Sequence, residues 1–459
     1  MIPRVFIAFF ISSVLAGCNV GTNDLKDKFP IKNTAVLFDR DSIVFALNAG
    51  GKAHIGIDGV RYQADAVLTD DSRVPTGKIR GAQDGTIYRS YRSGSLNIQR
   101  QVANGLYDVT FQFAELEDIA MGERVFDIVV NGKRVIESLD VLRARDGNHR
   151  SALDRTVTGV IVDKGELDIE LLPGVSSPIL NGLVIRRQKP DSRSWDLIWG
   201  DEFDRGDTPD RSNWNIDIWR ARKVNDEDQA YTDREKNIRV VDGKLILEAH
   251  RESFDDAAYT SGRVQSQGKG DFLYGRVDIR AKLPAGQGTW PALWMLPSDP
   301  YRYATSCGDG EDWHGSTSCD AWPNSGEIDI MEHVGYDMGH VHGTVHNRAF
   351  YWANQEQRKG SVEVPDAGKA FHIYSLEWAP EHIHIYLDGS LYFSYYRQQA
   401  AWEAWPYDHS YHLILNLAVG GMWGRAGGPI DDDIFPVSME VDYVRVFKAR
   451  DSETRGEDP

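Results

Sequence analysis

Short segments of alternating apolar and polar residues run along most of the chain, and long helical periodicity is missing. In the first half, apolar residues take every second position from Tyr107 to Phe113, from Phe126 to Val130 and from Leu167 to Leu171. The second of these runs ends at Asn131-Gly132, which is a strong hairpin signal. Because residues two apart share one face of a strand, the first half is predicted to be a β-sandwich.

The second half has the same character. Apolar residues alternate with charged ones from Val277 to Leu283, and apolar residues alternate again from Ile383 to Leu387 before the turn at Asp388-Gly389. Many strands at short spacing without helical stretches predict a large sandwich or jelly roll. The expected fold class of the whole chain is all-β.

The distribution of tryptophan divides the chain into two modules. All thirteen tryptophans lie at or beyond Trp195, and 459 residues are long for a single core. The polar, proline-containing run just before Trp195 predicts a linker. The expected organisation is a leader at 1–18, a tether at 19–35, a first domain at 36–187, a linker at 188–194, a second domain at 195–448 and a polar tail at 449–459.

The first eighteen residues have the pattern of an export signal. Arg4 precedes an almost wholly apolar run that ends at Leu15-Ala16-Gly17-Cys18, and this run is too short to span a membrane. The ending resembles the bacterial lipoprotein signal, which implies a lipidated Cys18. With Asn19 after the cysteine, the resemblance implies a lipid anchor in the outer membrane or at the surface of a Gram-negative bacterium. The alternative is a secretory signal that is simply cleaved.

The overall charge narrows the choice of partner. A formal net charge of −18 argues against nucleic acid, because phosphate binding needs a basic face, and it mildly disfavours a polyanionic substrate. A neutral polymer suits the chain better, and we expect a monomer. Cys307 and Cys319 flank a polar, glycine-rich loop, and export to an oxidising compartment favours a disulfide over two free thiols.

Three acids lie close together in an apolar run from Pro323 to Gly335. In a regular strand Glu327 and Asp329 share one face, whereas Glu332 points the other way. A β-bulge near Ile330 or Met331 brings Glu332 onto the face of the other two acids. The alternative is an ordinary strand whose acids are solvated or ion-paired.

Paired carboxyl groups on one face suit hydrolysis of a glycosidic bond. One carboxylic acid protonates the leaving oxygen while a carboxylate acts across the sugar, and a separation of about 5 to 5.5 Å gives retention of configuration. Glu327 and Glu332 can converge to that separation after the bulge. Asp329 between them is expected to hold a proton or a hydrogen bond toward Glu327 and to keep the two titrations apart.

The stretch Gly326-Glu-Ile-Asp-Ile-Met-Glu332 resembles the active-site strand of glycoside hydrolase family 16. Further similar stretches follow in the same order, among them Trp199 to Asp204, Gly288 to Pro297 and Leu413 to Gly421. The resemblance implies a jelly-roll catalytic domain in which Glu327 is the nucleophile, Asp329 the assisting acid and Glu332 the general acid/base.

Within that family the chain is most similar to the laminarinases, which implies endo-hydrolysis of β-1,3-glucan. The alternatives are a mixed-linkage β-glucanase, an agar- or carrageenan-type galactanase, or, in a different class, a non-catalytic glycan-binding surface lipoprotein. The resemblance implies that catalysis needs no cofactor.

The resemblance also implies a set of groove residues. Trp290 and Trp294 are placed to stack on a pyranose, Arg263 and Asn416 to bond sugar hydroxyls, and Trp423 to form a subsite wall. Each of these could instead be a structural residue of its strand. His340, His342 and His346 alternate along one strand and suggest a metal site, but the resemblance instead places His346 beside Glu332.

Two further features follow from the resemblance to the family. Many members bind a structural calcium ion, and Asp442 matches that position, with backbone oxygens near Glu202 and Gly243 as possible co-ligands. The chain departs from the usual laminarinase pattern at 301–322, where an insertion with Trp313 and His314 precedes the catalytic strand. It is placed to cap one end of the groove.

The first domain resembles the malectin-like carbohydrate-binding domain. The stretches that carry this resemblance are Phe45 to Gly51, Tyr107 to Glu115, Arg124 to Gly132 and Pro178 to Ile185. The candidates for sugar binding are Tyr88, Tyr91 and Phe113, although Phe113 equally suits the core. The alternative for this domain is a structural spacer.

Overall fold

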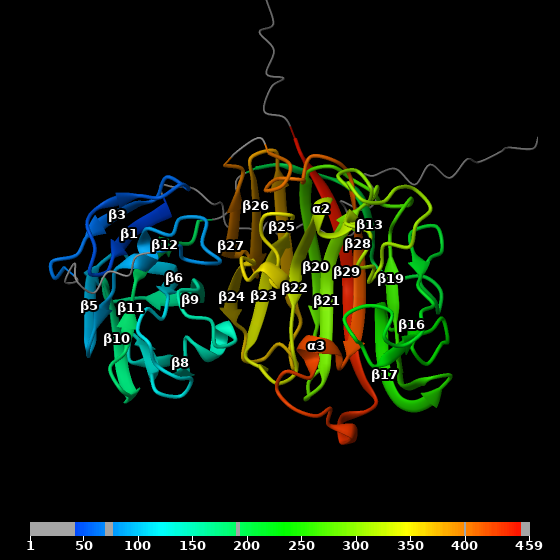
Figure 1. Cartoon of the computed structure of the whole chain (residues 1–459), viewed down its shortest axis with the longest axis horizontal. Helices are drawn as coiled ribbons and strands as arrows, with labels where there is room; N and C mark the ends of the chain where they lie inside the picture. The colour runs from blue at the N-terminus through cyan, green and yellow to red at the C-terminus, as the bar shows by residue number, and fades with distance from the viewer. Residues whose placement is uncertain (1–41, 69–76, 190–192, 399–400, 451–459) are drawn as a thin grey trace, which may run out of the picture. The chain divides into compact units, whose positions relative to one another are not determined.

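The computed structural model describes residues 42–68, 77–189, 193–398 and 401–450. The predicted leader and tether, with Cys18, and residues 451–459 of the predicted polar tail lie outside the described residues, whereas Ala449, the first residue of that tail, still belongs to the last strand. Strands account for most of the regular structure, so the predicted all-β class is confirmed (Figure 1). Within the described residues, no helix combines the length and the apolarity needed to cross a membrane.

The first module is a β-sandwich. Its strands and 3-10 turns are β1 (Ile43–Asn48), β2 (His54–Ile55), β3 (Arg61–Ala64), η3 (Ile87–Arg89), β4 (Arg92–Ser93), β5 (Leu96–Gln101), β6 (Gly105–Phe113), β7 (Val125–Val130), β8 (Lys133–Leu139), η4 (Arg143–Arg145), β9 (Leu153–Val162), β10 (Glu166–Val175), β11 (Ile179–Leu180) and β12 (Gly182–Arg187). One layer has the order β9-β6-β12-β1-β3-β2 and the other β5-β10-β7-β8, while β4 and β11 form a short pair.

Alternate residues of the two layers form the core of this module. Tyr107, Val109, Phe111 and Phe113 on β6 are fully buried and belong to one apolar cluster with Ile128 of β7. The period-two pattern of the sequence therefore predicted the inward face of β6 correctly.

The second module is a larger sandwich with its own core. Its elements are β13 (Trp195–Asp201), β14 (Asn215–Ile216), β15 (Gln229–Tyr231), β16 (Ile238–Val241), β17 (Lys244–Phe254), β18 (Ala257–Ser261), β19 (Arg263–Gln265), β20 (Gly275–Lys282), β21 (Thr289–Pro297), α2 (Ala321–Asn324), β22 (Glu327–Glu332), β23 (His340–His346), η5 (Trp352–Asn354), β24 (Arg358–Glu363), β25 (His372–Ala379), β26 (His382–Leu387), β27 (Ser390–Tyr396), β28 (Tyr411–Val419), α3 (Gly421–Gly424), η6 (Asp432–Ile434) and β29 (Val437–Ala449).

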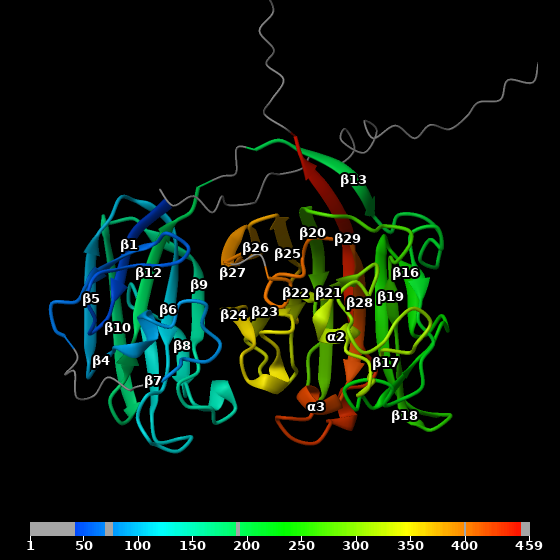
Figure 2. The ribbon, with the colours of Figure 1, turned by 45° about the horizontal axis from the view of Figure 1, so that its top comes forward.

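Two sheets form the layers of the second module (Figure 2). The inner sheet is the run β14-β19-β28-β21-β22-β23-β24, and the outer sheet is the run β15-β18-β17-β29-β20-β25-β26-β27, with β13 beside β29 and β16 beside β17. Apolar residues from both sheets, such as Ile279, Leu293, Ile328 and Leu376, are fully buried in one cluster between them. The opposite face of the inner sheet is left to polar and aromatic side chains, and it carries the candidate site.

Candidate active site

A β-bulge in β22 brings the three acids together. On one side, Asp329 pairs with Trp294 and Glu332 pairs with Ala292. Three steps along β22 therefore correspond to two along β21, so one extra residue lies in β22 between the acids. Because Trp294 and Ala292 share a face of β21, Asp329 and Glu332 share a face of β22, and the predicted bulge is confirmed.

The pairing of β22 with its other neighbour, β23, has the same register shift. Glu327 lies opposite His346, Asp329 opposite Thr344 and Glu332 opposite His342, with the irregularity between Asp329 and Glu332. The extra residue is accommodated on the core side, where Ile330 and Met331 are fully buried. All three acids consequently project from the inner sheet on the side away from the core.

Burial raises the pKa values of all three acids, and repulsion from neighbouring acids adds to this effect for Glu327 and Asp329. Burial, together with the charge of Glu332, raises the pKa of Glu327 to about 7. Burial raises the pKa of Glu332 to about 7, against the opposing effects of Trp290 and Lys359. Burial and the charges of its two neighbours raise the pKa of Asp329 well above its usual range, so Asp329 is protonated and hydrogen-bonds to Glu327.

Two indole N–H groups hold the two glutamates in place. Trp322 Nε1 donates to Oε2 of Glu327 over 2.8 Å, and Trp290 Nε1 donates to Oε1 of Glu332 over 3.1 Å. Each bond stabilises the ionised carboxylate. Like charges on one face disfavour double ionisation, so the pair of glutamates retains one proton near neutral pH.

The predicted groove residues gather around these acids. The Trp294 indole donates to Asn416 over 2.7 Å, and the amide of Asn416 donates to Tyr231 over 3.1 Å. Arg263, opposite Asn416 on β19, is ion-paired with Asp217 at 2.7 Å. These bonds fix the side chains along the face shared with the acids.

Trp423 belongs to α3, which contacts β21 and β28. Its ring packs edge-on against Trp290, with centroids 5.7 Å apart, and lies 5.3 Å from the ring of His342. The predicted set Trp290, Trp294, Arg263, Asn416 and Trp423 is thus brought together on the inner sheet.

The predicted position of His346 beside Glu332 is wrong. Its Nε2 lies 3.4 Å from Oδ2 of Asp329 and 3.8 Å from Oε1 of Glu327. The reason is the register, which places His346 opposite Glu327, while the bulge places His342 opposite Glu332. Burial lowers the pKa of His346 to about 3, so its ring is neutral beside the acids.

The three alternating histidines of β23 form no common metal site in the part of the chain that the structure describes. Only two side-chain groups there have the spacing to hold an ion, and neither contains more than one of these histidines. His340 instead bridges Asp337 at 2.5 Å and Glu363 at 2.6 Å.

Two residues of the site escaped the sequence analysis. Trp322, which bonds Glu327, stands at the end of the 301–322 insertion and outside any alternating pattern. Lys359 on β24 lies opposite Thr344, with its ammonium 5.6 Å from the centre of the Trp423 ring. Burial lowers the pKa of Lys359 to about 8, and its positive charge lowers the pKa of Glu332. The sequence of β24, Arg358-Lys-Gly-Ser-Val-Glu363, has no alternation of apolar and charged residues that could have indicated the position of Lys359.

The predicted calcium ligands already have other partners. Asp442 accepts a bond from Arg280 at 2.5 Å, and Glu202 accepts two bonds from Arg445 at 2.7 and 2.8 Å. Gly243 lies in a turn with φ of 71°. Both carboxylates are paired with an arginine, and the predicted backbone co-ligands near Glu202 and Gly243 are not affected by these pairs. Calcium binding at Asp442 stays a prediction that requires the pair with Arg280 to open.

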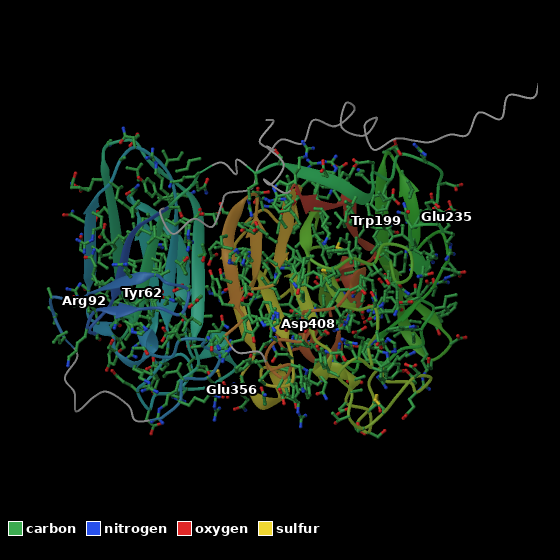
Figure 3. All side chains as sticks on the ribbon, turned by 90° about the horizontal axis from the view of Figure 1, so that it is seen from above. Tyr62, Arg92, Trp199, Glu235, Glu356 and Asp408 are labelled. Atoms are coloured by element: carbon green, nitrogen blue, oxygen red, sulfur yellow. A yellow bond between two sulfur atoms is a disulfide. The ribbon has the colours of Figure 1, made fainter. Side chains whose placement is uncertain are left out.

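The two mature cysteines are joined by a disulfide, as predicted. Cys307 and Cys319 close a loop of the insertion, twelve residues apart in the sequence. Figure 3 draws the described side chains on the ribbon. In the first module, the candidate sugar-binding aromatics are all buried. Phe113 packs against Phe111 and Phe126 in the core, which is the alternative considered for it. The hydroxyls of Tyr88 and Tyr91 donate to Asp154 and Glu117.

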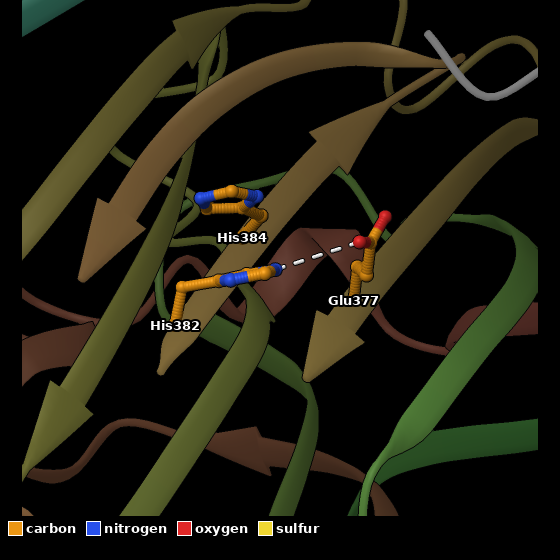
Figure 4. A group of neighbouring side chains, drawn as sticks. All are labelled: Glu377, His382 and His384. Atoms are coloured by element: carbon orange, nitrogen blue, oxygen red, sulfur yellow. Dashed lines mark hydrogen bonds and ion pairs between the residues drawn. The ribbon is translucent and has the colours of Figure 1, made fainter. Parts of the chain in front are cut away.

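A second cluster of titratable side chains lies on the outer sheet, away from these acids. Glu377 on β25 and His382 and His384 on β26 bring one ligand atom each within 4.8 Å of the others (Figure 4). Arg193, however, donates to both carboxylate oxygens of Glu377 at 2.6 Å. Although burial opposes it, these bonds hold the pKa of Glu377 well below its usual range. We interpret the group as an ion-pair network that fastens the end of the linker to the outer sheet.

Comparison with known proteins separates the two modules. Residues 225–445 match the family described as Glycosyl hydrolases family 16, and residues 43–182 match the Malectin domain. A β-glucanase of Rhodothermus marinus is 44% identical over 260 residues, which cover 55% of this chain and 85% of that protein.

Solved structures resemble the same part of the chain. The laminarinase from Rhodothermus marinus is 43% identical with a TM-score of 0.51, and the match covers 57% of this chain and 100% of that one. SCLam, described as a non-specific endo-β-1,3(4)-glucanase, is 37% identical with a TM-score of 0.50 over 57% of this chain and 95% of that one. The shared region carries β22 and its three acids.

Proposed function

Because the chain belongs to family 16 of the glycosyl hydrolases, we propose that it cuts β-1,3-glucan chains internally with net retention of configuration. The observation that carries the proposal is the bulge in β22, which puts Glu327 and Glu332 on one face with one proton between them near neutral pH. The names of the similar proteins support the choice of β-glucan as the substrate.

The two glutamates have different roles in the reaction. Glu327, with hydrogen bonds from Trp322 and Asp329 to its carboxylate, attacks the anomeric carbon and forms a glycosyl ester. Glu332 gives its proton to the leaving oxygen in the same step. Glu332 then takes a proton from water, the water attacks the anomeric carbon, and Glu327 leaves as the carboxylate. Two inversions give net retention.

Asp329 and His346 support the nucleophile. Asp329 stays protonated because it is buried between two acids, so it donates to Glu327 and spreads the developing charge of the leaving carboxylate. The neutral ring of His346 adds no positive charge beside Glu327. Trp290, Trp294 and Trp423 offer ring faces and edges for the sugars on either side of the scissile bond.

Incubation of the purified protein with laminarin tests this proposal. We expect new reducing ends, a rapid fall in polymer length and a product that initially has the β configuration by proton NMR. Glu327→Gln should reduce kcat by a factor of about 10³ or more, because the amide cannot form the ester. The absence of reducing ends with the natural chain, an initial α product, or full activity in Glu327→Gln would contradict it.

A second candidate substrate is mixed-linkage β-glucan. It is favoured by the similarity to SCLam, whose description covers both β-1,3 and β-1,4 bonds. Rates on laminarin, lichenan and agarose separate the possibilities. A higher kcat/KM on lichenan would replace β-1,3-glucan as the preferred substrate, and activity on agarose alone would point to a galactanase.

We also propose that the protein is exported and anchored by lipid at Cys18. The support is the sequence, in which an apolar run ends at Leu15-Ala-Gly-Cys18. Expression in a Gram-negative host with labelled fatty acid should label the natural chain and place it in the membrane fraction. Cys18→Ser should lose the label and become soluble in the periplasm or medium, and a labelled Cys18→Ser would contradict the anchor site.

A further inference from the structure

The inserted segment before β22 contains an ordered loop. We call residues 307–319, closed by the bond between Cys307 and Cys319, the disulfide loop. At its base, the Asp320 carboxylate accepts bonds from the backbone N–H groups of Thr305 at 2.8 Å and Ser306 at 2.9 Å. The covalent bond and these hydrogen bonds limit the conformations that the loop can adopt.

The disulfide loop packs against the segment between β14 and β15. The ring of His314 meets the ring of Trp219 edge-on, with centroids 5.0 Å apart. Asp312 of the loop lies 3.9 Å from the ammonium of Lys223, and that ammonium lies 4.6 Å from the Trp219 ring. Trp313 stacks on His314 with centroids 4.0 Å apart. The contacts leave Trp313 and His314 half-buried rather than enclosed.

These rings continue into the groove without a break. The guanidinium of Arg263 lies 4.4 Å from the Trp219 ring on one side and 4.9 Å from the Trp294 ring on the other. Trp294 is the strand partner of Asp329. A series of flat groups therefore runs from Trp313 in the loop to the catalytic strand.

The loop end of this series is electrically neutral. Burial, with the positive charges of Arg263 and Lys223, lowers the pKa of His314 to about 4. The stacked pair of His314 and Trp313 is thus uncharged at neutral pH. An uncharged aromatic surface with a polar rim suits a neutral sugar, whose C–H face packs on an indole.

We propose that the disulfide loop forms an additional sugar-binding subsite of the groove, in which the indole of Trp313 is the platform for a pyranose of the β-glucan chain. The inference rests on the proposed glucanase function. The loop contacts Trp219 and Lys223, which follow the edge strand β14, and three strand spacings, about 14 Å, separate the next strand β19 from β22. The subsite therefore binds a sugar well away from the scissile bond.

Such a subsite has a characteristic kinetic effect. Contacts with a remote sugar are equal in the bound substrate and in the transition state, so they lower KM and leave kcat unchanged. They act only on chains long enough to reach the loop. They also bias where a long chain is cut, and so the lengths of the first products.

The test compares Trp313→Leu, Trp313→Phe and Ile218→Ala in the full chain, on laminarin and on β-1,3-linked oligosaccharides of increasing length. Trp313→Leu keeps an apolar side chain but removes the ring, and Trp313→Phe keeps a ring face. Ile218, a 65% exposed apolar residue beside Trp219, is the matched control. We expect Trp313→Leu to raise KM for laminarin about three- to tenfold, with kcat within a factor of two, and to shift the product lengths.

The pattern across substrates and variants decides the outcome. Trp313→Phe should retain most of the affinity, Ile218→Ala should behave as the natural chain, and the shortest cleaved oligosaccharides should not distinguish the variants. An unchanged KM for laminarin in Trp313→Leu would overturn the subsite. So would an equal loss on short and long substrates, because the loop would then act by supporting β22. If the natural chain leaves laminarin uncut, the proposed function itself fails.

The double variant Cys307→Ser/Cys319→Ser provides a second measurement, with thermal unfolding recorded in parallel. We expect the same length-dependent rise in KM, because an open loop holds Trp313 less often in the binding position. A variant that unfolds at the natural temperature and binds long chains as well as the natural protein would show that the disulfide has no part in the subsite.

Discussion

At the scale of single residues, Trp322 is the contact on which the nucleophile depends. Its indole donates to the carboxylate of Glu327 over 2.8 Å and so lowers the pKa of that group. Trp322→Phe keeps an aromatic ring and removes the donor. We expect kcat/KM to fall about 10- to 100-fold, the value of a hydrogen bond to a charged group. The acid limb of the pH profile should move to higher pH, because Glu327 must be ionised to attack.

The control for this variant is Trp352→Phe, which changes a 49% exposed tryptophan of η5. It should leave both the rate and the acid limb unchanged. A Trp322→Phe enzyme with a lower rate but an unshifted acid limb would show that the indole acts only through packing.

Lys359 is predicted to set the pH at which activity falls on the alkaline side of the pH–activity profile. Its charge lowers the pKa of Glu332, which burial raises to about 7. Glu332 must be protonated to act as the acid, so activity falls as the pH rises through that value. Lys359→Met removes the charge, raises the pKa of Glu332 and should extend activity to higher pH. Lys359→Arg keeps the charge and should retain the natural limb. Profiles of kcat/KM between pH 5 and 9 measure both, and a limb unmoved by Lys359→Met would contradict this role.

The raised pKa values also predict a cost in stability. Glu332 binds its proton more tightly in the folded chain, where its pKa is about 7, than in the unfolded chain. The favourable effect is complete below the unfolded pKa, about 4.3, and stability is lost as the pH rises toward 7. Glu332→Gln cannot ionise. We expect it to be more stable than the natural chain at pH 8, by on the order of 1 kcal/mol, and to lose that advantage at pH 4. Thermal unfolding at the two pH values is the measurement, and an equal difference at both would contradict it.

At the scale of elements, the register of β22 was the part of the site that could be predicted from the sequence. Acids at 327, 329 and 332 cannot share a face of a regular strand, so a common function required one extra residue, and the bulge provides it. Which histidine of β23 lies opposite which acid of β22 could not be predicted in the same way. His346 lies beside Glu327 and not Glu332 because pairing depends on where β23 begins, which the alternation of His340, His342 and His346 does not determine.

Contacts that depend on the course of loops could not be predicted from the sequence either. Trp322 reaches Glu327 because the chain turns at α2 just before β22, and the pattern around Trp322 has no periodicity to indicate that turn. Likewise, Asp442 lies on β29, but its partner Arg280 comes from β20, 162 residues away in the sequence. Pairings across such separations depend on sheet order, which alternation alone leaves open.

The end of β22 is predicted to tolerate only glycine at position 335. A Cβ there would lie 1.7 Å from the carbonyl oxygen of Gly286, where the chain passes the loop that leads into β21. Gly335 N–H also donates to Thr289 over 2.9 Å, so the backbone has little freedom to move away. Gly335→Ala should destabilise the second module by about 1–3 kcal/mol and lower activity by disturbing β22.

Gly339→Ala is the matched control for that variant. The nearest atom to a Cβ at position 339 is 4.0 Å away, in the side chain of Glu363. Thermal unfolding of both variants should show a loss only for Gly335→Ala. Equal stabilities would mean that the loop before β21 moves easily.

At the scale of the whole molecule, the two modules have separate apolar cores. The largest cluster contains residues from Phe203 to Val446 only, and the clusters of the first module contain residues from Phe45 to Ile185 only. A chain that begins at Arg193 is therefore expected to fold and to cut soluble laminarin with the kcat of the full chain. The first module then acts, if it binds glucan, by holding the enzyme near the polymer.

The effect of the first module should appear with insoluble substrate. Two modules that bind the same polymer raise the local concentration of each at its site, so the full chain should bind particles of β-1,3-glucan more tightly than the shortened chain. Glu327→Gln in both backgrounds prevents degradation while binding is measured by sedimentation. We expect the full chain to bind with an apparent affinity about 10²-fold higher, the lower limit of a bivalent effect. Equal retention would favour the alternative of a structural spacer, in agreement with the burial of Tyr88, Tyr91 and Phe113.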